Sequence, residues 1–168
     1  MKKIFLIIQI TLALLLADKT YSVAELEVRE ETVYEVESGK PADGLLKIYF
    51  DHGEIKTEVP LKNGKSSGIE KKFFPTGLLA SAVPFHDGKE NGVAKKYFES
   101  GGVQFETPFE NGLKEGISKE YYPDGNLKSE IRFEKGEAVE GHKYLENGTK
   151  KSVPKDLLKW IQPNKGLF

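Results

Sequence analysis

From Gly44 onward, the hydrophobic, polar and glycine positions of this 168-residue chain recur with a period of 24 residues. Four full units span residues 44–67, 68–91, 92–115 and 116–140, the last with one extra residue. A half unit at about 33–43 precedes them, and a short unit at 141–150 follows. A fixed period of this length indicates a repeat architecture in which each unit packs on its neighbours.

Within each unit, counted from its leading glycine as position 0, an aliphatic residue stands at +1, lysine at +3 and aromatic residues at +5 and +6. Glycine returns at +9 and +20, as Gly53, Gly77, Gly101 and Gly125, and as Gly64, Gly88, Gly112 and Gly136. The +9 glycine suits a three-residue hairpin turn that ends in a left-handed residue. The +20 glycine, which follows Asn or Asp in three units, predicts a second turn that links each hairpin to the next.

A three-residue loop predicts that +6 pairs with +10, +5 with +11, +3 with +13 and +1 with +15. Positions +1, +5, +11, +15 and +17 then share one apolar face, and +2, +4, +10, +12 and +14 share a polar face. Proline recurs at +16 and predicts strand ends or bulges, because it cannot donate to the ladder. We therefore expect an all-β fold, an elongated antiparallel meander of stacked hairpins.

The two ends of the chain depart from the repeat. At the C-terminal end, a short capping helix is predicted over about 154–162, with Leu157, Leu158 and Ile161 on one side. At the N-terminal end, Lys2 and Lys3 precede an apolar run over 4–17, a pattern typical of an export signal. Small residues at Ser22 and Ala24 favour cleavage before Glu25, which gives a signal peptide over 1–24 and a single domain over 25–168. Cleavage after Ala17 or Ser22, or an uncleaved anchor, stays open.

The unit G-x-x-K-x-[YF]-[YF]-x-x-G-x-[ILV] resembles the MORN-repeat variant family of bacteria, whose members are often grouped as YwqK-type antitoxins. The resemblance covers residues 33–148. It implies a hairpin-repeat sheet with a binding or scaffolding role and no shared catalytic residues. An export signal departs from an ordinary cytoplasmic antitoxin.

Composition narrows the function classes. The chain holds 25 Lys and Arg against 26 Asp and Glu, a balance that argues against a nucleic-acid binder. It has no cysteine, which excludes disulfides, thiolate catalysis and cysteine-ligated zinc. Its three histidines occupy different repeat positions, and no GxSxG, HExxH or P-loop spacing occurs. We expect no enzymatic activity, no cofactor and no metal.

Two sets of side chains are candidates for partner binding. The aromatic residues at +6 fall on the predicted polar face, where they either pack in a groove or form an exposed stripe: Phe50, Phe74, Phe98 and Tyr122. The lysines at +3 either are solvated or form a row for an anionic partner: Lys47, Lys71, Lys95 and Lys119. Glutamates at +14 neutralise much of that row.

Together these features predict an exported, non-enzymatic scaffold in the periplasm, in the envelope or outside the cell. Its expected partner is a protein or an envelope component, and direct membrane contact is a further alternative. The alternative function is an immunity or antitoxin protein that neutralises a secreted toxin.

Overall fold

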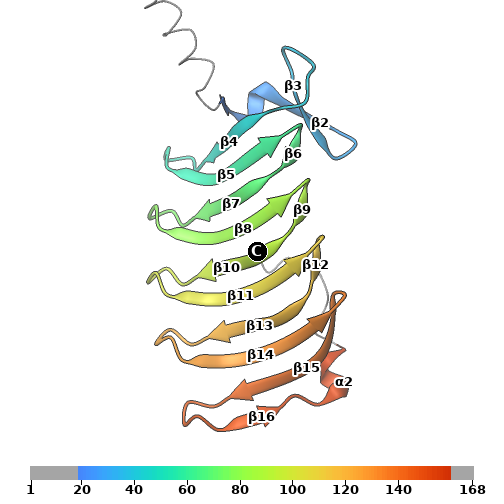
Figure 1. Ribbon diagram of the computed structural model, residues 1–168. Coiled ribbons are helices and arrows are strands. Elements are labelled where there is room, and N and C mark those ends of the chain that lie inside the picture. The colour runs from blue at the N-terminus through green and yellow to red at the C-terminus, as the bar shows by residue number, and fades with distance from the viewer. Residues whose placement is uncertain (1–18, 160–168) are drawn as a thin grey trace, which may run out of the picture.

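The computed structural model describes residues 19–159, and most of them form one long sheet of stacked hairpins (Figure 1). The strand order follows the chain order, β1-β4-β5-β7-β8-β10-β11-β13-β14-β15-β16, and every neighbouring pair from β4 onward is antiparallel. The predicted antiparallel meander is confirmed. Over residues 19–159, no helix has the length and apolar character needed to cross a membrane.

The four full units have the same strand pattern. Each begins with a six-residue strand: β4 (Gly44–Tyr49), β7 (Gly68–Phe73), β10 (Gly92–Tyr97) and β13 (Gly116–Tyr121). Each continues with an eight-residue strand: β5 (Ile55–Lys62), β8 (Leu79–His86), β11 (Val103–Glu110) and β14 (Leu127–Glu134). Two-residue strands lead from one unit to the next: β6 (Lys65–Ser66), β9 (Lys89–Glu90) and β12 (Leu113–Lys114).

Both glycine positions lie in the turns that the sequence predicts. In the fourth unit, the amide of Gly125 donates to the carbonyl of Tyr122 at 2.9 Å, and the amide of Tyr122 donates to the carbonyl of Asn126 at 2.8 Å. Gly125 has φ 87°, so the loop is a three-residue turn closed by a left-handed glycine. At +19 and +20, Asn111 and Gly112 have φ 52° and 84°, as a two-residue type I′ turn requires.

The register departs from the prediction beyond the turn. Pairing of +5 with +11 is observed, as Tyr49 with Ile55, but the register then shifts by one between Ile48 and Tyr49. Lys47 consequently pairs with Glu58 at +14 instead of with +13. The same shift recurs in all four units, because a β-bulge inserts one extra residue, at +12, in the second strand.

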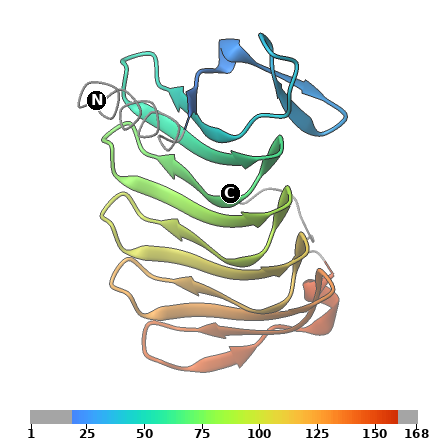
Figure 2. The same cartoon turned by 45° about the horizontal axis from the view of Figure 1, so that its top comes forward.

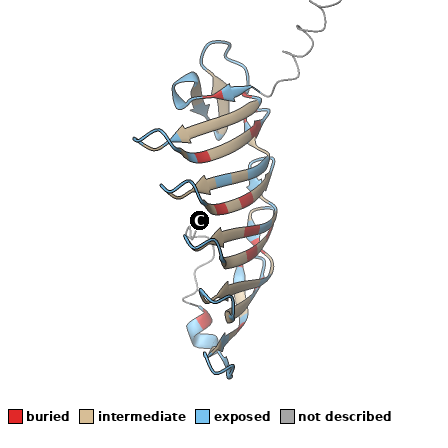
Figure 3. Ribbon diagram, turned by 90° about the vertical axis from the view of Figure 1, so that its left-hand side faces the viewer, coloured by how far each residue is buried: buried red, intermediate tan, exposed pale blue. Residues whose placement is uncertain are grey.

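The bulge changes which residues share a face, and the predicted face assignment is wrong in this respect. Positions +1, +3, +5, +11, +14 and +16 form one face, which we call the lysine face. Positions +2, +4, +13, +15 and +17 form the other, which we call the core face. On the core face, Val83, Ala94 and Phe109 are buried together, with Phe85 packed against them. These buried positions lie away from the exposed three-residue turns (Figure 3).

The two-residue turns stack on one another along the sheet. The amide of each +20 glycine donates to the carbonyl 22 residues earlier, so that Gly88 binds Ser66, Gly112 binds Glu90 and Gly136 binds Lys114, all at 2.9 Å. This column of hydrogen bonds repeats along the stack that Figure 2 shows.

The +16 prolines do not mark strand ends. Pro60 lies inside β5, opposite Leu45, and its carbonyl accepts a hydrogen bond from Ser67, the residue between β6 and β7. The nitrogen of Pro60, which has no hydrogen to donate, therefore faces the gap between β6 and β7. No hydrogen bond of the sheet is lost there. The bulge itself occurs four residues earlier.

Short elements close the two ends of the sheet. At the N-terminal end, β1 (Thr20–Tyr21) pairs in parallel with β4, and a single-turn 3₁₀ helix η1 (Val23–Glu25) leads to a separate hairpin of β2 (Leu26–Arg29) and β3 (Thr32–Glu35). At the C-terminal end lie β15 (Glu137–Tyr144), β16 (Lys150–Ser152) and the helix α2 (Lys155–Leu158).

The capping helix is shorter than predicted and has a different packing side. Leu158 is buried against Gly141 and Val153, but Leu157 is 52% exposed. Because adjacent residues of an α-helix point about 100° apart, Leu157 is turned away when Leu158 faces the sheet. Ile161 and the predicted end of the helix at 162 lie outside the described residues.

Candidate binding surface

The lysine face carries a row of charged side chains that crosses the strands at right angles. The row follows from the register, because each +3 residue pairs with the +14 residue of its own unit and with that of the preceding unit. In order along the sheet, the row reads Lys47, Glu58, Lys71, Ala82, Lys95, Glu106, Lys119, Glu130 and His142. From Lys47 to Glu130, positive and negative residues therefore alternate except at Ala82.

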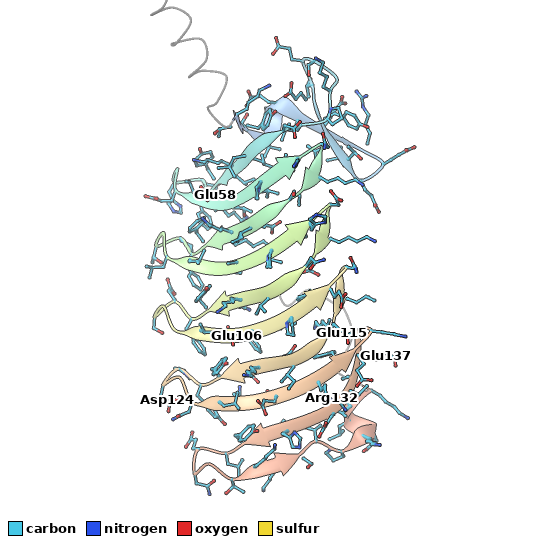
Figure 4. The ribbon with its side chains drawn as sticks, in the orientation of Figure 1. Glu58, Glu106, Glu115, Asp124, Arg132 and Glu137 are labelled. Carbon is cyan, nitrogen blue, oxygen red and sulfur yellow. The ribbon has the colours of Figure 1, made fainter. Side chains whose placement is uncertain are left out.

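Direct ion pairs join neighbours in this row. Glu58 lies 3.9 Å from the ammonium of Lys47 and 4.0 Å from that of Lys71, and Lys95 lies 2.9 Å from Glu106. Figure 4 labels Glu58 and Glu106, the carboxylates on β5 and β11 on the two sides of the interruption. These cross-strand pairs stabilise the sheet modestly, as expected for partly exposed charges.

Hydrogen bonds from tyrosines hold the carboxylates in place. The hydroxyl of Tyr121 donates to Glu106 at 2.9 Å, and that of Tyr144 donates to Glu130 at 2.7 Å. The hydrogen bond from Lys95 is the main cause that lowers the pKa of Glu106, and the same bond raises the pKa of Lys95. Burial, assisted by the bond to Glu106, raises the pKa of Tyr121. Lys95 and Glu106 are therefore both charged near neutral pH.

Ala82 leaves the centre of the row without a carboxylate. It pairs with Lys71 on one side and with Lys95 on the other, and the two lysine backbones are two strand spacings, or about 9.6 Å, apart. Each of these lysines has a carboxylate partner only on its outer side, Glu58 or Glu106. Across Ala82, the two lysines therefore face each other with no carboxylate between them.

A band of exposed aliphatic side chains runs beside the row. The +1 residues Ile69, Val93 and Ile117 are 53%, 48% and 49% exposed, on three successive units. The sequence predicts them in the core, but the bulge places them on the opposite face from Phe109. The interrupted part of the charge row therefore borders apolar surface that is available to a partner.

The aromatic residues at +6 do not form a stripe opposite the core. Because adjacent strand residues face opposite sides, +6 lies on the side of the core face when +5 lies on the lysine face. All four are half-buried. Lysines at +12 cover two of them, with Lys56 5.8 Å from the ring of Phe50 and Lys128 5.7 Å from that of Tyr122. These contacts leave part of each ring exposed, so both packing and partner binding stay open for this set.

Charges on the core face form a second, smaller group near the two-residue turns. The ammonium of Lys114 is buried over the ring of Phe133, at 5.1 Å, and Glu90 lies near it. Burial lowers the pKa of Lys114 and raises the pKa of Glu90. Glu70 and Lys72 form an ion pair at 3.5 Å on the same face. Lys114 is buried in this group, whereas the side chain of Lys72 is partly exposed.

The histidines are dispersed. His52 stacks on Phe50 in a turn, His86 ends β8 beside Asp87, and His142 lies in the charge row. Within residues 19–159, no group of three His, Asp or Glu side chains is arranged to hold a metal ion. One open hollow is lined by Tyr122, Leu145, Glu146 and Asn147, and another, near the N-terminal hairpin, is lined in part by Lys19, Tyr21 and Glu35.

Sequence reasoning identified the lysines of the row but missed the importance of Ala82. The signal was present, since the other three units have glutamate at +14. It could not be interpreted without the register, because the predicted pairing of +3 with +13 separates Ala82 from Lys71 and Lys95.

Three segments of the chain match the model of the MORN repeat variant, residues 42–63, 90–111 and 114–135. Each match begins two residues before a leading glycine and ends at the first residue of a two-residue turn. Repeats of this family are often protein- or membrane-binding modules and are typically non-enzymatic. No curated protein matches the chain.

Proposed function

We propose that this protein is an exported, non-enzymatic scaffold of the bacterial envelope whose lysine face binds an acidic segment of a second protein. The N-terminal lysines and the apolar run over 4–17 support export. The interruption of the charge row at Ala82 is the observation that carries the binding role. A carboxylate of the partner, placed over Ala82, completes the alternation between Lys71 and Lys95, while apolar partner side chains cover Ile69 and Val93.

Charge arithmetic favours a protein partner over a lipid surface. Along the row, four lysines oppose Glu58, Glu106 and Glu130, so the row has an excess of only one positive charge. An anionic membrane attracts broad polybasic patches, whereas a single side chain of a protein needs only one local site. The immunity function implied by the antitoxin grouping is the special case in which the bound protein is a toxin.

The test is affinity capture from an envelope extract with three baits of the full chain. Ala82→Glu supplies the missing carboxylate from within the protein, and Ser100→Glu adds the same charge in an exposed turn as the matched control. A true partner is retained by wild type and by Ser100→Glu. The amount captured by Ala82→Glu should be lower by about tenfold or more, because like charges then face each other in the interface.

Two outcomes contradict the proposal. Equal retention of every captured protein by Ala82→Glu and wild type would show that the partner uses another surface. The second outcome is that all three baits bind phosphatidylglycerol vesicles and that no captured protein is lost with Ala82→Glu. This would favour direct membrane contact.

A further inference from the structure

Residues 19–25, which lie just beyond the apolar leader, are part of the folded domain, and their placement bears on where the leader is removed. We infer that the leader is cleaved after Ala17, so that the mature chain begins at Asp18. This inference rests on the proposed export. Cleavage before Glu25, which the small residues Ser22 and Ala24 favour from sequence alone, would instead remove a structural element.

That element is β1, which covers the first edge of the long sheet. Thr20 and Tyr21 pair with Leu45 and Leu46 of β4, and the amide of Leu45 donates to the carbonyl of Lys19 at 2.7 Å. The approach is so close that a Cβ atom on Gly44 would lie 2.1 Å from this carbonyl oxygen. In the next three units, the leading glycine meets the proline of the preceding unit. Residues 19–21 thus occupy the place of a preceding repeat.

Tyr21 also supplies the centre of the N-terminal core. It is 2% exposed and packs with Ala42 and Leu61, with Leu46 and Val59 against this cluster. It is the largest fully buried side chain among residues 19–159. A mature chain that begins at Glu25 would leave this cavity open and the backbone edge of β4 unpaired, a surface prone to aggregation.

Polar contacts fix the same segment to the hairpin that follows. The hydroxyl of Tyr21 lies 2.5 Å from Glu35 and 3.0 Å from the carbonyl of Asp43, and the ammonium of Lys19 lies 2.8 Å from Glu35. Together with the hydroxyl of Ser38, these contacts lower the pKa of Glu35 to about 2, with the Lys19 bond as the largest cause. Residues on both sides of the predicted cleavage site are therefore joined in one packed unit.

Among the three candidate sites, only the one after Ala17 leaves this unit complete. Cleavage after Ser22 or after Ala24 removes Lys19 and Tyr21 together. Cleavage after Ala17 places alanine at the −1 position, ends directly at the apolar run and gives a 17-residue leader, within the normal range. At this site the −3 residue is Leu15, which is larger than Ser22, the −3 residue for cleavage after Ala24. The preference for small residues at −3 and −1 therefore favours cleavage after Ala24 when the sequence is considered alone.

The first experiment reads the mature N-terminus. The full chain with a C-terminal tag is expressed in a bacterium with a periplasm, and the exported form is analysed by intact mass and N-terminal sequencing. We expect the sequence to begin at Asp18. Ala17→Leu should block processing, whereas the matched substitution Ala24→Leu, at an exposed residue, should leave it unchanged. An N-terminus at Val23 or Glu25, or an exported chain that keeps its leader, would overturn the inference.

A second experiment does not depend on export. Chains that begin at Asp18 and at Glu25 are purified from the cytoplasm, and their urea midpoints and solubility are compared. The shorter chain should unfold at lower urea and aggregate sooner, and equal midpoints would overturn the inference. If the full chain stays in the cytoplasm with Met1 while the shorter chain is unstable, export fails as a proposal but the structural role of residues 19–24 holds.

Discussion

Phe133 and Ile117 provide a direct test of the bulged register. The unbulged pairing places both residues on one buried face, whereas the observed pairing places Phe133 on the core face and Ile117 on the lysine face. Phe133 is 2% exposed and Ile117 is 49% exposed, although both belong to the same hairpin. Replacing each by alanine therefore separates the two registers by the size of the loss.

The expected losses follow from burial. Phe133→Ala removes a buried ring and leaves a cavity, so the free energy of unfolding should fall by about 3–5 kcal/mol. Ile117→Ala removes a side chain that is only half covered. Full burial of an aliphatic side chain contributes about 1.5–3 kcal/mol, so the free energy of unfolding should fall by about half of that, or about 0.7–1.5 kcal/mol. Phe133 also loses its contact with the ammonium of Lys114.

Urea unfolding followed by far-UV circular dichroism measures both losses. With a denaturant slope of about 2 kcal/mol per M, the midpoint should fall by about 1.5–2.5 M for Phe133→Ala and by about 0.4–0.7 M for Ile117→Ala. The slope must stay constant across the variants, because repeat arrays can lose cooperativity. Equal losses, or a larger loss for Ile117→Ala, would refute the face assignment.

Three further outcomes are expected. Gly125→Val should lower the free energy of unfolding by about 1–3 kcal/mol; the cause is backbone strain at positive φ and not a clash, since no atom lies within 4 Å of the new Cβ. The neighbouring change Asn126→Ser should lower it by less than about 0.5 kcal/mol. Equal urea midpoints for the two variants would contradict the turn. Glu35 has its pKa lowered from 4.5 to about 2, so its stabilisation is present above pH 4.5 and is lost as the pH falls toward 2. Thermal melts at a series of pH values measure this loss of stability, and it should be absent in Glu35→Gln. The same dependence of melting temperature on pH in the variant and in wild type would argue against the Lys19 contact. Glu106→Gln should lower the raised pKa of Tyr121 without restoring its ordinary value, because burial is the larger cause; tyrosinate difference absorbance measures this, and no shift would contradict the hydrogen bond.

Much of this fold is determined locally, and the sequence alone therefore predicts it. The 24-residue period, the two turns per unit and the antiparallel order of the hairpins depend on residues that are close in the chain. Gly125 can adopt φ 87° without strain, and an Asn-Gly pair such as Asn111 and Gly112 suits a type I′ turn. The lysine positions also follow from the period, whichever face they occupy.

The tertiary structure decided the faces, the interruption of the charge row and the N-terminal edge. A single inserted residue at +12 reverses the side to which every later residue of the strand points, and short-range periodicity does not reveal it. The pairing of Ala82 with Lys71 and Lys95 depends on this register, across strands from different units. Tyr21 belongs to the core only because β4 lacks a preceding repeat and accepts β1 in its place, a contact between segments more than twenty residues apart.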